Sequence, residues 1–146
     1  MRFYDRDNEI AVLKEIEQQS RKSATFTVLM GRRRVGKTSL ILRSLQEADH
    51  VYLFVSKDSE AMLCEKFQRA IESELNIKVY GALTHFRDVF EVLMRESQNR
   101  PFTVILDEFQ NLAKVNPAIF DEMQDIWDRY HNASHINLIA SGSIVS

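Results

Sequence analysis

The sequence has little of what makes disulfide bonds, flexible linkers or repeats. It contains one cysteine, Cys64, which excludes a disulfide within the chain and fits a reducing cytoplasm. Proline and glycine are scarce, with 2 and 4 residues among 146, and we find no linker, internal repeat or low-complexity stretch. We expect Cys64 to fill a hydrophobic core, because it falls on the apolar side of a helical pattern.

Long apolar runs and a large charge of one sign are also absent. No run approaches the roughly 20 apolar residues of a membrane-spanning helix, and the charged opening MRFYDRDNEI lacks the form of a secretory signal. The formal net charge of -2 gives no overall reason to expect binding to nucleic acid or to a membrane. These absences predict a cytoplasmic protein with no membrane partner.

What the sequence does contain is an alternation of β-rich and helical patterns, in a length of 146 residues that suits one domain. Short apolar runs predict strands over 25–30, 51–56, 102–109 and 136–141. Patterns of helical period predict helices over 8–16, 37–46, 60–75, 84–97 and 116–130, capped by Asp5 or Asp7, Thr84 and Asn116. Apolar strands alternating with amphipathic helices indicate an α/β fold, a parallel sheet covered on both faces.

The segment GRRRVGKTSL, residues 31–40, poses the main functional question. It is either a solvated basic turn or a loop that binds phosphate. Residues 31–38 fit the pattern G-x-x-x-x-G-K-[ST], and a strand is predicted before them and a helix after them, as a phosphate-binding loop requires. The two glycines allow backbone N–H groups to approach an anion closely, and the helix N-terminus favours negative charge. We therefore favour the phosphate-binding loop.

This loop supplies the predicted nucleotide contacts. Lys37 carries a mobile charge for the β- and γ-phosphates, and the Thr38 hydroxyl is a predicted Mg²⁺ ligand. The arginines are expected to point mostly away from the phosphates, where they form ion pairs and attract phosphate generally, or else contact a neighbouring subunit or nucleic acid. The predicted nucleotide-binding set is Gly31, Arg32, Arg33, Arg34, Val35, Gly36, Lys37, Thr38 and Ser39.

Two carboxylates end the predicted strand over 102–109, where parallel sheets bind their ligands. Asp107 can hold Mg²⁺ directly or through water, and Glu108 can orient and deprotonate an attacking water. The alternative is that both are solvated residues that cap the next segment. Ser141 and Ser143 end the last predicted strand, where a hydroxyl could contact the γ-phosphate or the water. The predicted catalytic residues are Lys37, Glu108, Ser141 and Ser143, and the predicted metal ligands are Thr38 and Asp107.

These segments resemble those of a known family. FYDRDNEI, GRRRVGKTSL, VILDEFQNL and LIASGS are similar to the opening box, Walker A, Walker B and sensor-1 segments of prokaryotic AAA-type ATPases, and more narrowly of the archaeal-type group near the STAND signalling NTPases. The resemblance implies a P-loop NTPase of the additional-strand class, in which the Walker A strand neighbours the sensor strand and the Walker B strand comes next. It also implies that Phe3, Tyr4 and Arg6 lie near the adenine, and that ATP is preferred to GTP.

The chain stops at Ser146, just past the predicted sensor-1 strand, so we expect the family's fifth strand, arginine finger and helical lid to lie outside it. We expect a partial ATPase domain over 1–146, with a nucleotide-proximal segment over 1–22 and the region from Walker A to sensor 1 over 23–146. Without a fifth strand, the strand over 25–30 becomes an uncharged sheet edge, which predicts self-association or aggregation unless the N-terminal segment covers this edge. Nucleic acid is expected as a partner only of regions beyond this chain.

Three functions fit these patterns. One is an ATPase that uses ATP and Mg²⁺ and couples hydrolysis to rearrangement of a region absent from this chain. The second is a nucleotide-dependent signalling switch with slow or no hydrolysis, and the third is a small-molecule kinase. The pair Asp107 and Glu108 argues against the kinase, because activation of water would waste the phosphoryl group. The ATPase and the switch both stay open, because the regions that distinguish them lie beyond Ser146.

Overall fold

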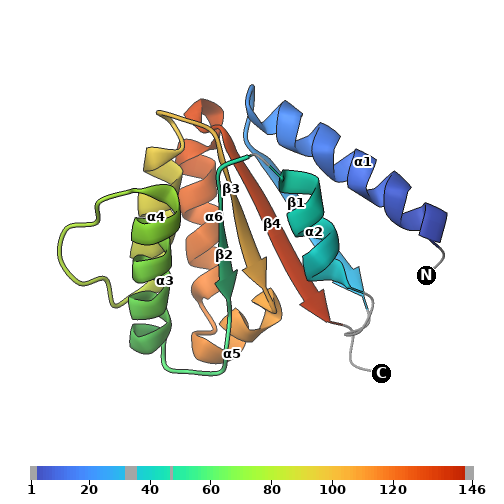
Figure 1. The fold of residues 1–146 in the computed structure, drawn as a ribbon. Helices are drawn as coiled ribbons and strands as arrows, with labels where there is room; N and C mark the ends of the chain where they lie inside the picture. Colours follow the sequence, from blue (N-terminus) through green and yellow to red (C-terminus); the bar gives the residue numbers. More distant parts are fainter. Residues whose placement is uncertain (1–2, 32–35, 47, 144–146) are drawn as a thin grey trace.

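The computed structural model describes residues 3–31, 36–46 and 48–143. In chain order its elements are α1 (Phe3–Ser20), β1 (Thr25–Gly31), α2 (Lys37–Leu45), β2 (His50–Phe54), α3 (Glu60–Leu75), α4 (Phe86–Glu96), β3 (Phe102–Asp107), α5 (Leu112–Val115), α6 (Ile119–Tyr130) and β4 (Ile136–Ser143). Two short 3₁₀ helices, Phe109–Asn111 and His131–Ala133, follow β3 and α6. The predicted α/β alternation is confirmed (Figure 1).

The four strands form one parallel sheet in the order β1-β4-β3-β2. The predicted neighbours are confirmed, because β1 lies beside β4 and β3 comes next. In register, Asp107 of β3 pairs with Ser141 of β4 and with Phe54 of β2. The carboxyl ends of all strands therefore meet at one edge of the sheet, where α2 begins (Figure 1). This edge is the place where open α/β sheets bind ligands.

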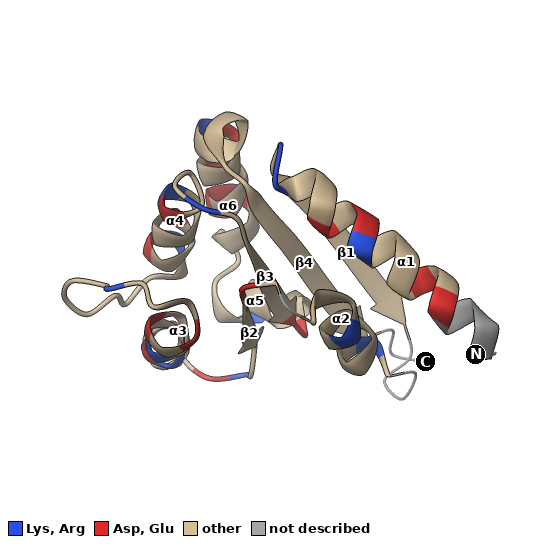
Figure 2. Cartoon of the chain, turned by 45° about the horizontal axis from the view of Figure 1, so that its top comes forward, with Lys and Arg blue, Asp and Glu red and all other residues tan. Residues whose placement is uncertain are grey.

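Helices cover the sheet in two layers, as their apolar stripes require. On one face α1 and α2 pack over Ile105 and Ile139 of the two central strands. On the other face α3, α4 and α6 enclose the larger core, which includes Cys64, as predicted. Charged residues lie mainly on the helices and connecting segments, while the strands are almost uncharged (Figure 2). No helix in the described part of the chain is long and apolar enough to cross a membrane.

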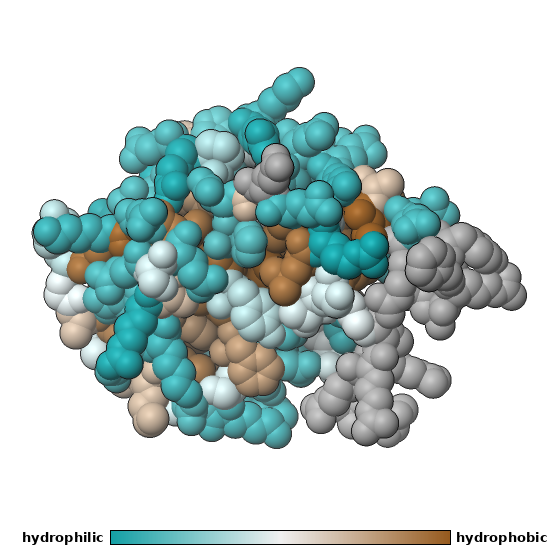
Figure 3. Space-filling model, viewed as in Figure 1, coloured by the Kyte–Doolittle hydropathy of each residue, from teal (hydrophilic) through white to brown (hydrophobic). Residues whose placement is uncertain are grey.

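The sheet is not covered on both faces at β1, which corrects the prediction. Strands β3 and β4 are buried along their whole length, but Phe26, Val28 and Met30 on one face of β1 are 54%, 50% and 48% exposed. Phe26 and Val28 border a groove of about 380 Å³ between β1 and α6, which we call the β1 groove. In this groove Phe26 contacts Trp127, with ring centroids 5.9 Å apart. Hydrophilic side chains cover most of the face seen in Figure 3, with apolar ones in its middle.

The predicted helix caps are wrong in the structure. Asp5 and Asp7 lie inside α1, which begins at Phe3. The N-cap of α4 is His85 instead of Thr84, and the first helical N–H, that of Phe86, is bound 2.9 Å away by the Glu60 carboxylate of α3.

The start of α6 also differs from the prediction. The Asn116 side chain accepts a hydrogen bond from the backbone of Ala118 at 3.0 Å, in a turn that precedes α6 instead of capping it. Phe120 of α6 is not part of the core, because it is 39% exposed in the β1 groove.

Candidate functional site

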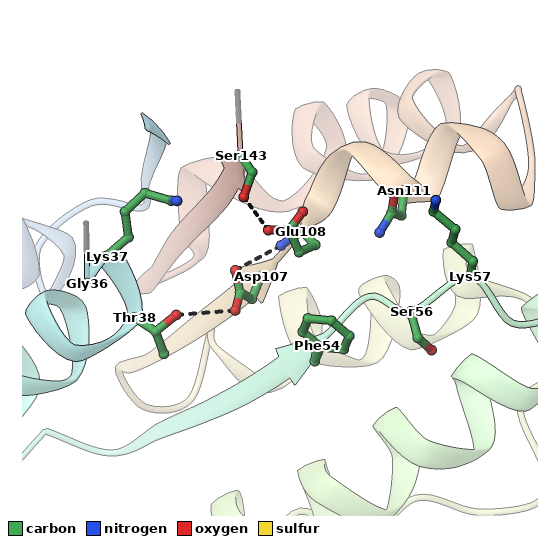
Figure 4. A pocket seen from close by; sticks show the side chains of 10 residues that line it. All are labelled: Gly36, Lys37, Thr38, Phe54, Ser56, Lys57, Asp107, Glu108, Asn111 and Ser143. Carbon is green, nitrogen blue, oxygen red and sulfur yellow. Dashed lines mark hydrogen bonds between the residues drawn. The ribbon is translucent and has the colours of Figure 1, made fainter. Parts of the chain in front are cut away.

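A cleft of about 630 Å³ opens at the carboxyl edge of the sheet. Elements far apart in the sequence line it: the start of α2, the segment after β2, the end of β3 and the end of β4 (Figure 4). The lining residues are Gly36, Lys37, Thr38, Phe54, Ser56, Lys57, Asp107, Glu108, Asn111 and Ser143. Two lysines and two carboxylates therefore face one cavity, an arrangement suited to an anion that brings its own cation.

The predicted phosphate-binding loop joins β1 to α2 at one end of the cleft. Gly36 has φ 74° and ψ 33°, a left-handed conformation that glycine adopts without steric cost, and the next residue begins α2. The Lys37 Nζ donates a hydrogen bond to the Gly31 carbonyl oxygen at 3.4 Å, so its ammonium group lies beside the end of β1. The predicted contacts at Arg32, Arg33, Arg34 and Val35 lie outside the described residues. Ser39 is exposed on α2 and is not among the residues that line the cleft.

The two predicted metal ligands are brought together. The Thr38 Oγ1 donates to the Asp107 Oδ2 at 3.2 Å, and Asp107 is 8% exposed. The backbone N–H of Glu108 donates to the other oxygen, Oδ1, at 3.0 Å (Figure 4). The described residues contain no cluster of three or more His, Cys, Asp or Glu side chains that could enclose a metal. One hydroxyl and one carboxylate nevertheless fit Mg²⁺, which takes few protein ligands and completes its shell with water and substrate phosphate.

Tyr52 of β2 belongs to the same cluster and was missed in the sequence. Its hydroxyl donates a short hydrogen bond to the Asp107 Oδ2, the oxygen that also binds Thr38. Burial of the phenol raises the pKa of Tyr52 above its ordinary value, and the hydrogen bond to Asp107 raises it further. The sequence signal for this contact was a tyrosine between two apolar residues of a strand. Because successive side chains of a strand point to opposite faces, and Val51 and Leu53 face the larger core, Tyr52 must face the layer of α1 and α2.

Glu108 is held at the cleft by its backbone and by two side chains. Its φ of 56° is left-handed, which is uncommon for a residue other than glycine and turns the chain from β3 into the 3₁₀ helix. The Ser143 hydroxyl donates to the Glu108 Oε1 at 2.5 Å, and the Gln110 Nε2 donates to the Oε2 at 2.5 Å. Asn111 anchors this turn, because its Nδ2 donates to the Val55 carbonyl oxygen at 2.9 Å. The structure thus brings Ser143 to Glu108, two residues that sequence spacing could not connect.

Other predicted site residues lie elsewhere. Ser141 is fully buried in β4 and does not line the cleft, and its Oγ has no hydrogen-bond partner among the described residues. Its catalytic role stays a prediction. Phe3, Tyr4 and Arg6 begin α1, for which the structure describes the backbone alone at these positions, so their contact with adenine also stays a prediction.

Comparison with known proteins agrees with this geometry. Over residues 3–146 the sequence matches an ATPase domain found predominantly in Archaea. The chain belongs to this family. It is also 31% identical over 145 residues to an uncharacterized protein of Methanocaldococcus jannaschii, and the match covers 99% of this chain and 30% of that protein. The ATPase domain family supports nucleotide binding by this domain.

Solved structures of archaeal proteins share this fold. A Walker-type ATPase of Pyrococcus abyssi has a TM-score of 0.65 and 21% identity, covering 89% of this chain and 43% of its own. Cdc6p of Pyrobaculum aerophilum has a TM-score of 0.64 and 15% identity, covering 99% of this chain and 40% of its own. At these identities the likeness shows the fold alone. The chain spans less than half the length of each protein.

Proposed function

We propose that this domain binds Mg-ATP in the cleft and hydrolyses it. The observation that carries the proposal is the convergence of Lys37, Thr38, Asp107, Glu108 and Ser143 on one cavity at the carboxyl edge of the sheet. Residues 31–38 serve as the Walker A loop, and Asp107 and Glu108 serve as the Walker B pair. Hydrolysis is coupled to movement of regions outside this chain, which would make the domain the nucleotide-driven part of a longer assembly.

Each side chain has a separate task in this proposal. Lys37 binds the β- and γ-phosphates, while Thr38 and Asp107 hold Mg²⁺, which neutralises phosphate charge when bound. Glu108 accepts a proton from water as the water oxygen attacks the γ-phosphorus and the bond to the β-phosphate oxygen breaks. Ser143 fixes the Glu108 carboxylate through the hydrogen bond to Oε1. None of these contacts involves the base, so ATP is proposed over GTP on the family resemblance alone.

The test is a titration of ATP, ADP and GTP with Mg²⁺, paired with an assay of phosphate release. Lys37→Ala should weaken Mg-ATP binding at least about tenfold, or about 1.4 kcal/mol, because it removes the charge that meets the phosphates. Lys78→Ala is the matched control, since Lys78 is exposed and does not line the cleft. Equal affinity in folded Lys37→Ala and in the parent would refute the phosphate-binding loop.

We also propose that the domain self-associates through β1. In the described sheet β1 is an edge strand, and its apolar face at Phe26, Val28 and Met30 is about half exposed. An edge with unpaired N–H and C=O groups and no charged side chain is a template for another strand. Helix α1 packs on the opposite face of the sheet, over Ile105 and Ile139, and leaves this apolar face uncovered.

A further inference from the structure

Gln110 lies next to the proposed general base but was not among the predicted site residues. It follows Glu108 by two residues in the 3₁₀ helix Phe109–Asn111. Its Nε2 donates to the Glu108 Oε2 at 2.5 Å, while Ser143 donates to the Oε1 at the same distance. Both carboxylate oxygens are therefore bound, one from the turn after β3 and one from the end of β4. A carboxylate bound on both oxygens cannot rotate without breaking a charge-assisted hydrogen bond.

The chemistry of the carboxylate determines how the Gln110 amide is oriented. Its NH₂ group must face Glu108, because a carbonyl oxygen in that place would repel the carboxylate. The Gln110 Oε1 then points away, and it is buried with no hydrogen-bond partner among the described residues. An unpaired buried carbonyl is unfavourable for folding, so this orientation is maintained at a cost to stability. Such a group needs an explanation, and the bond to Glu108 supplies one.

Gly142 of β4 provides the space that this orientation needs. A Cβ atom at Gly142 would lie 2.8 Å from the Gln110 Oε1, closer than real Cβ atoms approach a neighbour. It would also lie 2.8 Å from the Met30 sulfur and 3.1 Å from the Phe109 ring. The flexible methionine side chain can move aside. The Gln110 Oε1 can move away only if its Nε2 also leaves Glu108. A side chain at position 142 would therefore displace the amide from the carboxylate.

We infer that Gln110 is a positioning residue that fixes the direction of the Glu108 carboxylate, and that Gly142, which has no side chain, leaves the space that the Gln110 amide needs. The inference rests on the proposed role of Glu108 as general base. Gln110 does not line the cleft, so it acts through Glu108 and has no direct contact with nucleotide. Loss of a side chain that orients a metal ligand typically costs roughly 10–100-fold in activity, and we expect a loss of similar size for the side chain that orients Glu108.

The kinetic test uses the whole chain. Gln110→Ala should lower kcat for phosphate release roughly 10–100-fold and leave KM and the Kd for Mg-ATP within twofold of the parent. Gln124→Ala is the matched control, because the Gln124 Nε2 also donates to a carboxylate, Asp128, but on the exposed surface of α6. A Gln110→Ala variant with kcat within twofold of the parent, or with weaker Mg-ATP binding to the same extent, overturns the inference.

A double-mutant cycle separates positioning from general damage to the fold. Gly142→Ala should lower kcat as Gln110→Ala does, because the new Cβ displaces the amide. If both changes act through the bond to Glu108, the double variant should lose little more than either single variant. Losses that multiply would show that the two residues act independently and would overturn the role assigned to Gly142 and Gln110 as a unit.

A spectroscopic measurement tests the contact without any turnover. The side-chain amide of Gln110 should give ¹⁵N–¹H signals that are shifted from those of Gln124 and exchange slowly with water, and Glu108→Ala should remove both differences. An ordinary Gln110 amide in the parent overturns the inference whether or not ATP is hydrolysed. If the parent chain releases no phosphate but shows the shifted, protected amide, the proposed function is contradicted. The hydrogen bond from Gln110 to Glu108 is then still supported.

Discussion

The hydrogen bond between Tyr52 and Asp107 should make the stability of the domain depend on pH in a way that one substitution removes. At neutral pH we expect Tyr52→Phe to lower the free energy of unfolding by about 1.5 kcal/mol. This is the low end of the range for hydrogen bonds to charged groups. The low end applies because Tyr52 is only partly buried and Asp107 keeps its bonds from Thr38 and from the Glu108 backbone.

The sign of the pH dependence follows from the raised pKa of Tyr52. Below about pH 10, the ordinary pKa of tyrosine, both the folded and the unfolded chain keep the phenol proton. Above it the unfolded chain loses this proton while the folded chain retains it, so unfolding becomes easier as pH rises toward the folded pKa. Between neutral pH and pH 11 the parent should therefore lose about 1.4 kcal/mol that the variant does not lose. The two stabilities should converge near pH 11.

Urea unfolding of parent and variant at pH 7.5, 9, 10, 10.5 and 11 measures this convergence. Other groups that titrate in the alkaline range contribute equally to both proteins, so the difference between the two curves isolates Tyr52. Tyr80→Phe is the control, because Tyr80 is 80% exposed and its substitution should change stability little at any pH. A difference between parent and Tyr52→Phe that stays constant up to pH 11 would refute the assignment of a raised pKa to this phenol.

Three further predictions concern the base, the sheet edge and the cysteine. Glu108→Gln should keep Mg-ATP bound while lowering phosphate release by roughly 10²–10⁴; equal rates would remove Glu108 from the mechanism. Val28→Asp should shift the protein toward monomer in size-exclusion chromatography with light scattering, because a charge on an edge strand discourages pairing. Val12→Asp on α1, at a similarly exposed position, should not. A parent that is already strictly monomeric would contradict the proposal. Burial raises the pKa of the Cys64 thiol to about 12, so iodoacetamide at pH 8 should label folded protein at least roughly 10²-fold more slowly than urea-unfolded protein; comparable rates would place Cys64 at the surface.

The elements and the cleft could be predicted because local patterns carry them. Periodicity marks a strand or helix from its own residues, and the phosphate-binding pattern depends on spacing within one loop. The convergence of Lys37 with Asp107 followed from the parallel sheet, since carboxyl ends of parallel strands share an edge. These predictions needed no knowledge of which side chains touch.

The contact of Tyr52 and the start of α4 could not be predicted because both depend on contacts between elements. Tyr52 reaches Asp107 only because β2 pairs with β3 in a register that places Tyr52 beside Ile105. The N–H group that starts α4 is bound by Glu60 of α3, which no local capping rule considers.

The exposure of one face of β1 could not be predicted for a different reason. Phe26 and Val28 look like core residues in the sequence, and only the absence of a covering helix over them in the described structure makes them surface. Periodicity identifies an apolar face but does not say what lies against it.

The position of β1 in the sheet also determines when the nucleotide site can form during folding. Within the described sheet β1 pairs with β4 alone, and the contact between Thr25 and Asn137 spans 112 residues of sequence. Such distant parallel pairs form slowly, because closing the long loop between them costs entropy before their contacts are gained. A ribosome that adds roughly 5–20 residues per second therefore exposes β1 for several seconds before β4 emerges. Strand β3, which ends at Asp107, can pair with β2 before β4 emerges, so Asp107 is already in place when the phosphate-binding loop joins the site.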